Sequence, residues 1–236
     1  MAVLGIQNCD LEGFGRYARL LTQWEVGLEV VRAHSGQPLP PSSGFDALLV
    51  GGTPISARDL AQHDFLRGES RYLAHAVAGG MPCLGICCGA QLLAQVLGAE
   101  VRRCERMEIG PCEVRLTDAG THDDVLAGFP RKFPVFQWHG DVFELPEHAR
   151  LLVEGEICRN QMFRVGSVLG VLFHLEVASG EVAAWADEYA HELALVGKSK
   201  AAVVSECEAS ESAMADLAER LLRNFLRSMA QLQLPL

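Results

Sequence analysis

Long apolar runs are missing from this sequence of 236 residues, and so is any concentration of positive charge. No stretch approaches the roughly 18 apolar residues that a membrane-spanning helix needs, so we expect no membrane contact. Residues 1–9 lack a basic segment followed by a long apolar stretch, so we expect no secretory signal. The formal net charge is −10 and the basic residues are scattered, which disfavours a nucleic-acid partner because like charges repel.

The eight cysteines also lack the paired spacing that is typical of metal ligands, since they fall at positions 9, 83, 87, 88, 104, 112, 158 and 207. The chain is not a small, cysteine-dense secreted domain, in which disulfides replace a core. We therefore expect reduced thiols in a cytoplasmic protein, most of them packed as small buried hydrophobic groups.

What is present is an ordinary globular composition, with 49% hydrophobic and 21% charged residues and no internal repeat. The first half alternates apolar runs with helical patterns. These patterns predict strands at 3–6, 28–31, 47–50 and 83–86, and helices at 13–24, 64–78 and 89–97. Such alternation predicts an α/β fold with a doubly wound, mostly parallel central sheet flanked by helices.

The pattern changes after about residue 99. Short strands are predicted at 101, 112–116, 135–138, 151–153, 162–165 and 168–173, which would form a small antiparallel extension. Helices are predicted at 180–195 and 206–231, joined by a connection at 197–205. The last helix carries one apolar stripe that we expect to dock on the core: Met214, Leu217, Leu221, Phe225 and Met229. We expect one domain over 1–236, with the helices of 180–231 packed on it.

The segment Gly85-Ile-Cys87-Cys-Gly89 is the most informative one for function. It places a cysteine between a buried strand and a helix, and the flanking glycines permit a tight turn, as in a nucleophile elbow. The N-terminus of the following helix favours negative charge, and the backbone N–H of Cys88 becomes a candidate oxyanion donor. The alternative is a structural cysteine buried at a tight turn.

A cysteine nucleophile needs a base, and the base needs a group that orients it. His174 and Glu176 follow the apolar run Val171-Leu-Phe173. On a strand, side chains two residues apart point to the same face. His174 could then accept the proton of Cys87, while Glu176 fixes its tautomer. A lone histidine at a strand end is more often structural, and Glu176 reverses that preference.

Two further segments complete the predicted site. Gly51-Gly52 follows the strand 47–50, where a glycine lets a backbone N–H approach a reacting carbonyl and makes Gly52 a second oxyanion donor. Phe136-Gln137-Trp138-His139-Gly-Asp141 reads as a strand that ends in a polar, aromatic cluster, a suitable wall for a small polar substrate.

Taken together, these motifs resemble the class I glutamine amidotransferase family. The resemblance covers roughly residues 46–177 and rests on Gly-Gly, on Gly-Ile-Cys-x-Gly-x-Gln and on Phe-His-x-Glu. Trp138-His-Gly-Asp141, Glu108-Ile-Gly110 and 160–166 look most like stand-alone members that are similar to the glutaminase domain of GMP synthetase. Some members of that group are γ-glutamyl peptidases.

The resemblance implies a flavodoxin-like fold and a catalytic triad of Cys87, His174 and Glu176. It implies oxyanion donors at Gly52 and Cys88, and a substrate-binding set of Gly51, Gln91, Gln137, Trp138 and His139. The implied reaction passes through a γ-glutamyl thioester and requires no metal or organic cofactor. The substrate would be glutamine or a γ-glutamyl compound. A synthetase or acceptor subunit is a compatible partner, and so is a homodimer.

The sequence departs from the family at Leu172, Leu175 and Cys88, and the two leucines predict a more apolar pocket. Several alternatives remain open at this stage. The protein could hydrolyse γ-glutamyl compounds itself, or deliver ammonia to a synthetase partner. The other interpretations are an α/β-hydrolase with a cysteine elbow, a DJ-1-like protein and a non-catalytic regulatory module.

Overall fold

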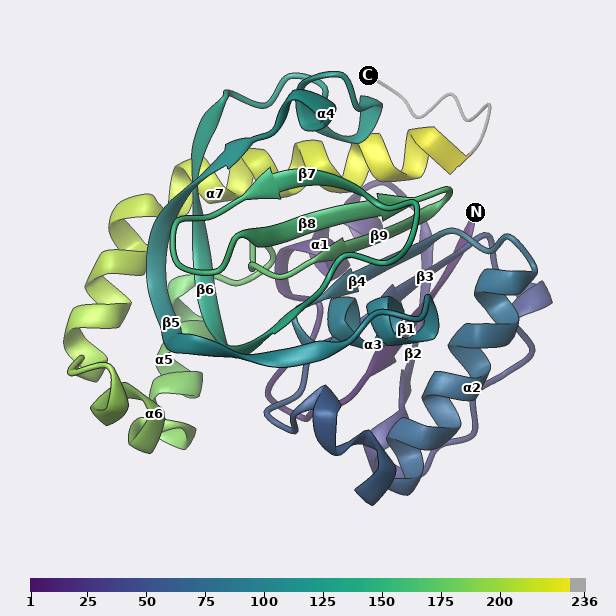
Figure 1. The fold of residues 1–236 in the computed structure, drawn as a ribbon, viewed down its shortest axis with the longest axis horizontal. Helices are drawn as coiled ribbons and strands as arrows, with labels where there is room; N and C mark the ends of the chain where they lie inside the picture. Colours follow the sequence, from purple (N-terminus) through teal and green to yellow (C-terminus); the bar gives the residue numbers. More distant parts are fainter. Residues whose placement is uncertain (230–236) are drawn as a thin grey trace.

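Nine strands form one sheet in the computed structural model, which describes residues 1–229. The order across the sheet is β2-β1-β3-β4-β9-β8-β7-β5-β6 (Figure 1). Five adjacent strands are parallel: β1 (Ala2–Gln7), β2 (Gly27–Arg32), β3 (Ala47–Val50), β4 (Cys83–Ile86) and β9 (Val168–Val171). The antiparallel part contains β5 (Val101–Leu116), β6 (Lys132–Phe143), β7 (Arg150–Glu154) and β8 (Asn160–Val165). The predicted α/β fold with an antiparallel extension is confirmed.

The antiparallel strands are longer than the sequence predicted. β5 is one strand of 16 residues, whereas only 101 and 112–116 had strand character. Its first half carries several exposed charged residues, and the pairing of β5 with β6 shifts register between Arg103 and Glu108. This irregularity breaks the period of two by which a half-buried strand is recognised.

Helices cover both faces of the sheet. One face packs against α1 (Gly15–Gln23), α5 (Ser179–Glu188), α6 (Ala190–Leu195) and α7 (Lys200–Met229). The other packs against α2 (Asp64–Ala78) and α3 (Cys88–Val96), while the short α4 (Asp118–Thr121) lies beside β7 (Figure 1). None of the helices within residues 1–229 has the length and apolarity required to cross a bilayer.

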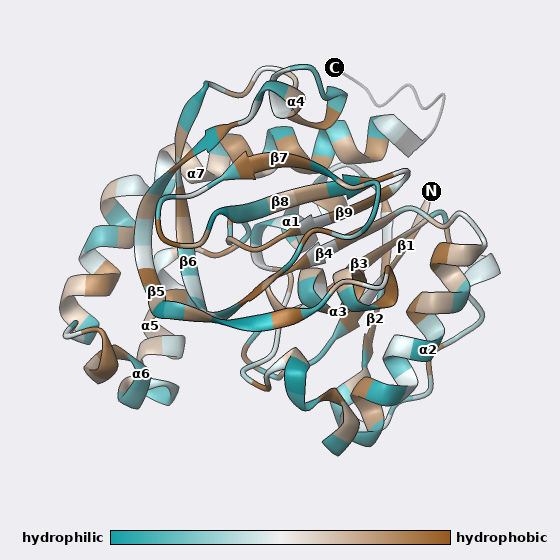
Figure 2. Ribbon diagram, in the orientation of Figure 1, coloured by the Kyte–Doolittle hydropathy of each residue, from teal (hydrophilic) through white to brown (hydrophobic). Residues whose placement is uncertain are grey.

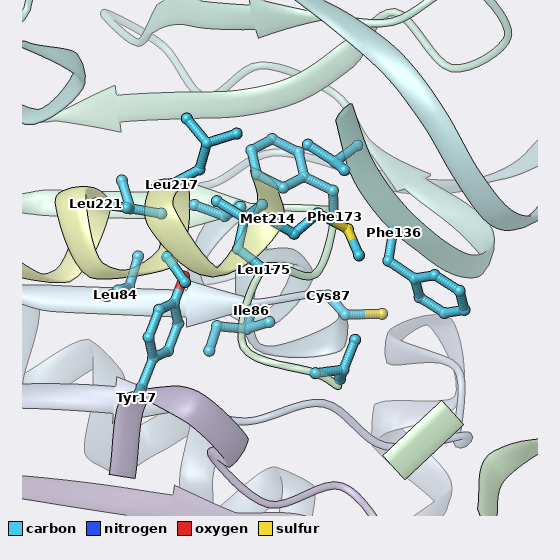
Figure 3. Packing of buried hydrophobic residues seen from close by; sticks show 14 of the residues in the cluster. Tyr17, Leu84, Ile86, Cys87, Phe136, Phe173, Leu175, Met214, Leu217 and Leu221 are labelled. Carbon is cyan, nitrogen blue, oxygen red and sulfur yellow. The ribbon is translucent and has the colours of Figure 1, made fainter. Parts of the chain in front are cut away.

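The C-terminal helix docks on the core as predicted. Met214, Leu217 and Leu221 of α7 face Leu84 and Leu175 in one buried cluster (Figure 3), and Phe225 is buried as well. The helix begins at Lys200, so the predicted connection 197–205 is wrong. Alanines at 201 and 202 favour helix, and burial of Val203 and Cys207, one turn apart, stabilises it. The side chain of Met229 and the predicted end at 231 lie outside the part of the chain that the structure describes.

Hydropathy follows this layering, with hydrophobic residues concentrated along the central strands and mixed bands along α2 and α7 (Figure 2). β3 and β4 are fully buried along their length, because helices cover both of their faces. The parallel strands all end at the same edge of the sheet. The loops that follow β1, β3, β4 and β9 therefore converge there, which is where ligands bind in open α/β sheets.

Candidate active site

Cys87 occupies a strained turn between β4 and α3. Its φ and ψ of +51° and −113° lie in a region that residues other than glycine rarely adopt. The turn packs tightly against the end of β3, because a Cβ on Gly89 would lie only 2.1 Å from the carbonyl oxygen of Val50. The N–H of Cys87 donates to the carbonyl of Val171 at 2.8 Å, which fixes the turn to β9.

His174 and Glu176 contact each other beside this turn. Nδ1 of His174 lies 2.6 Å from Oε1 of Glu176, and both residues are about 2% exposed. The strand argument for this contact is wrong, since β9 ends at Val171. His174 instead exchanges two backbone hydrogen bonds with Phe136 of β6, of 2.8 and 3.1 Å, and these hold the imidazole in place.

The charge of His174 is set by its two neighbours. Burial acts to lower its pKa, whereas the carboxylate of Glu176 and the interaction with Cys87 raise it, and the result lies well above the ordinary value. Glu176 occupies Nδ1, so Nε2 is the atom that remains to exchange a proton with Cys87. The structure therefore places a thiol, an imidazole and a carboxylate in the order that nucleophile activation requires, with Nε2 making no hydrogen bond to the thiol in this state.

The two predicted oxyanion donors lie next to the nucleophile. Cys88 is the first residue of α3, where backbone N–H groups have no acceptor inside the helix. A Cβ on Gly52 would lie 3.6 Å from Cβ of Cys87, so Gly52 is adjacent to the nucleophile. Gly51 differs, because its N–H donates to Ile6 and its carbonyl accepts from Asn8. Gly51 therefore fixes the loop and has no N–H left to offer.

A cleft of about 510 Å³ opens over Cys87. Its walls include Cys88, Gln91, Trp138, His139 and His174 of the predicted set. Gln91 donates from Nε2 to the carbonyl of Asp141 at 3.1 Å, and the thiol of Cys87 lies 3.7 Å from the carbonyl oxygen of Trp138.

Gln137 lies elsewhere. Its side chain is buried, donates from Nε2 to Gln161 at 2.8 Å and borders a second cavity rather than the cleft. The predicted polar strand end is also wrong, because β6 continues to Phe143. His139 therefore lies inside a strand, where burial, and secondly the positive charge of His174, lower its pKa to about 3. It is a neutral imidazole.

Leu172 and Leu175 do not make the pocket apolar as the sequence predicted. Both are buried in the core, on opposite faces of the sheet, and neither borders the cleft. Leu175 contributes through its backbone N–H, which donates to Oε2 of Glu176 at 3.1 Å and holds the carboxylate in position.

Several residues that line the cleft were not predicted, because no sequence motif marks them. Trp185, Tyr189 and Glu192 come from α5, α6 and the junction between them, and the ring of Trp185 packs edge-on against His174 at 5.0 Å. Glu12 follows β1, is buried, and accepts from the hydroxyl of Tyr189 at 3.2 Å. Burial raises the pKa of Glu12 to about 7, opposed by His174 and by the bond from Tyr189. Only the folded chain brings these single residues together.

The buried carboxyl of Glu12 makes the free energy of unfolding depend on pH, and Glu12→Gln should remove this dependence. A carboxyl whose pKa rises from 4.5 to about 7 on folding binds more protons in the folded state, so its ionisation destabilises the fold as the pH rises through this window. We expect Glu12→Gln to increase the free energy of unfolding by about 3 kcal/mol at pH 8 and by less than about 1 kcal/mol at pH 5. Urea unfolding at both pH values measures this. The same pH response in Glu188→Gln, on the exposed side of α5, would contradict it.

Comparisons with known proteins point to one family. The profile of the family "Glutamine amidotransferase class-I" matches residues 15–186. The glutamine amidotransferase-like protein YfeJ of Salmonella typhimurium is 32% identical over 75% of this chain and 76% of its own length. A glutamine-hydrolyzing GMP synthase subunit of Sulfolobus acidocaldarius is 31% identical over 71% of this chain and 87% of its own. A glutamine amidotransferase structure from Thermotoga maritima superposes with a TM-score of 0.89 at 28% identity, covering 96% of this chain and 98% of that one.

Proposed function

Because this chain belongs to the class I glutamine amidotransferase family, we propose that it hydrolyses the γ-amide of glutamine or of a γ-glutamyl compound through a thioester on Cys87. One observation carries the proposal. A cysteine on a strained elbow stands beside a histidine whose other nitrogen is held at 2.6 Å by a buried carboxylate. Such a series of groups activates a nucleophile and also returns its proton to the leaving group.

The reaction follows from these positions. The sulfur of Cys87, having passed its proton to His174, attacks the γ-carbonyl carbon and forms a tetrahedral oxyanion. The N–H groups of Cys88 and Gly52 stabilise that charge. The carbon–nitrogen bond breaks as imidazolium protonates the departing nitrogen, which leaves as ammonia or an amine. Water, deprotonated by His174, then cleaves the thioester, releases glutamate and restores the thiol.

The cleft also suits the rest of a glutamyl group. Glu12 and Glu192 border it together with Arg58 and Arg103, so it offers partners for an α-ammonium and for an α-carboxylate. Gln91, held by the carbonyl of Asp141, supports the same wall. A cleft of about 510 Å³ is in the range that buries ligands larger than an amino acid, which leaves space for an amine beyond the γ-nitrogen.

This space favours hydrolysis of γ-glutamyl compounds by the protein itself. The similarity to the Sulfolobus GMP synthase subunit supports the second candidate, a glutaminase that delivers ammonia to a separate synthetase. In the second case the acceptor of ammonia belongs to another chain, and glutamine alone is the substrate.

Comparing substrates separates the two candidates. We expect release of amine from at least one γ-glutamyl amine or peptide to exceed release of ammonia from glutamine at least tenfold in kcat/KM. Ammonia and free amine are measured in parallel, with Cys87→Ala as the blank. A preference for glutamine would favour the ammonia-delivering glutaminase, and no release from any substrate would refute the proposed hydrolysis.

A further inference from the structure

Cys104, His139 and Cys158 form a buried cluster behind the wall of the catalytic cleft. One ligand atom from each lies within 4.8 Å of those of the other two. Sγ of Cys104 is 3.7 Å from Nδ1 of His139 and 2.6 Å from Sγ of Cys158. The side chains come from β5, from β6 and from the connection between β7 and β8, and each is less than a tenth exposed.

Glu108 lies on the far side of the His139 ring from the two sulfurs. Its Oε2 lies 3.4 Å from Nε2 of His139, and it is buried as well. Nδ1 thus faces the sulfurs while Nε2 faces a carboxylate. Nε2 of His139 makes no hydrogen bond in this structure, and Glu108 is the carboxylate beside it. In metal sites a carboxylate at this position accepts the second N–H of the histidine and leaves the other nitrogen free as a ligand.

We propose that Cys104, Cys158 and His139 bind a zinc ion, with Glu108 orienting the imidazole. Thiolates and imidazole are the ligands that zinc prefers, and each thiol gives its proton to solvent on binding. In a tetrahedral zinc centre a nitrogen and a sulfur ligand lie about 3.6 Å apart, close to the distance between His139 and Cys104. The two sulfurs, 2.6 Å apart in this structure, would have to separate to about 3.8 Å when zinc binds.

The ion has a route to this cluster from solvent. Cys104, one of the three ligands, and Glu108 border the second cavity, of about 590 Å³, so an ion would enter past these two side chains and a water molecule could supply the fourth ligand. Neither Cys104 nor Cys158 takes part in the proposed amide hydrolysis, so the metal site does not rest on the proposed function.

The site would stabilise an irregular part of the sheet. Cys104 lies where the pairing of β5 with β6 shifts register, so zinc would tie this segment to β6 and to the chain before β8. His139 is adjacent to Trp138, whose carbonyl lies beside the thiol of Cys87. Binding would therefore stiffen the cleft wall without contacting the reacting atoms.

Cobalt(II), which takes the place of zinc and absorbs visible light, tests the proposal. The titration uses the full chain with Cys87→Ala, so that Cys87 and His174 cannot compete for the metal. We expect one equivalent of Co²⁺ to give sulfur-to-cobalt charge-transfer bands and tetrahedral d–d bands, which Zn²⁺ then displaces. Cys104→Ser with Cys158→Ser removes these bands, whereas Cys112→Ser, on the same strand and bordering the same cavity, retains them.

The spectrum of the parent chain tests the proposal even if the double variant does not fold, because a chain that binds zinc at two cysteines must show the charge-transfer bands with Co²⁺. Absence of those bands, or bands that survive in a folded double variant, would overturn the site. Loss of two hydrogen atoms between Cys104 and Cys158 on treatment with peroxide, without binding of either metal, would show a redox pair instead and would also overturn it.

Discussion

Cys87→Ala is expected to lower hydrolysis of the γ-amide substrate at least about a thousandfold. The alanine removes the only atom that forms the thioester, and the remaining groups can only position a water molecule and stabilise an oxyanion. The side chain is small and 7% exposed, so the fold should survive its truncation. Release of ammonia or amine under saturating substrate measures the loss.

The control for this prediction is another cysteine. Cys112→Ser changes a half-buried thiol on β5, outside the cleft, and is expected to retain activity within about threefold. Equal activity of the wild-type protein and Cys87→Ala would refute the nucleophile, since Cys87 is the thiol within residues 1–229 that interacts with the imidazole of His174.

Glu176→Gln has the second largest expected effect, a fall in kcat of at least about a hundredfold. Glutamine keeps the shape and still offers an oxygen to the N–H of Leu175, but it no longer carries the charge that His174 requires. Burial acts to lower the pKa of His174, and the charge of Glu176 is the largest influence that opposes it. The pKa of His174 should therefore fall in the variant. The imidazole of His174 should stay protonated through neutral pH in the wild-type protein, and it should lose its proton at a lower pH in the variant.

Nuclear magnetic resonance of the labelled imidazole separates this role from simple packing. A loss of activity with an unchanged titration of His174 would assign Glu176 to structure alone. Glu211→Gln serves as the comparison, because Glu211, like Glu176, accepts from a backbone N–H, but it lies away from the cleft and pairs with Arg16 instead of a histidine. We expect it to leave the titration of His174 where it is in the wild-type protein.

The elbow could be predicted from the sequence because its causes are local. A buried strand, two glycines and a helical pattern around Cys87 dictate a tight turn, and the contacts of Gly85 and Gly89 with neighbouring backbone show why no side chain fits there. The proximity of His174 and Glu176 was also predicted, although for the wrong reason. A local turn and a bridge to Phe136 bring them together, rather than the alternation of a strand.

The remaining parts of the cleft depend on tertiary packing. Glu12 and Tyr189 are 177 residues apart, and neither has a neighbour in the sequence that marks it. The cluster of Cys104 and Cys158 was not predicted for the same reason, since 54 residues separate the two cysteines and the pair lacks the short spacing by which a metal-binding motif is recognised. The directions of Leu172 and Leu175 were not predicted because strand periodicity fails once β9 ends at Val171.

The acyl-enzyme itself provides the most direct test of the role of Cys87. The protein is mixed with the preferred γ-glutamyl substrate, quenched in acid during turnover and analysed by mass spectrometry of the intact chain and of its peptides. We expect a γ-glutamyl adduct on the peptide that contains Cys87, removed by hydroxylamine and absent from Cys87→Ala. Turnover without an adduct on Cys87, or an adduct on another cysteine, would contradict the proposed mechanism.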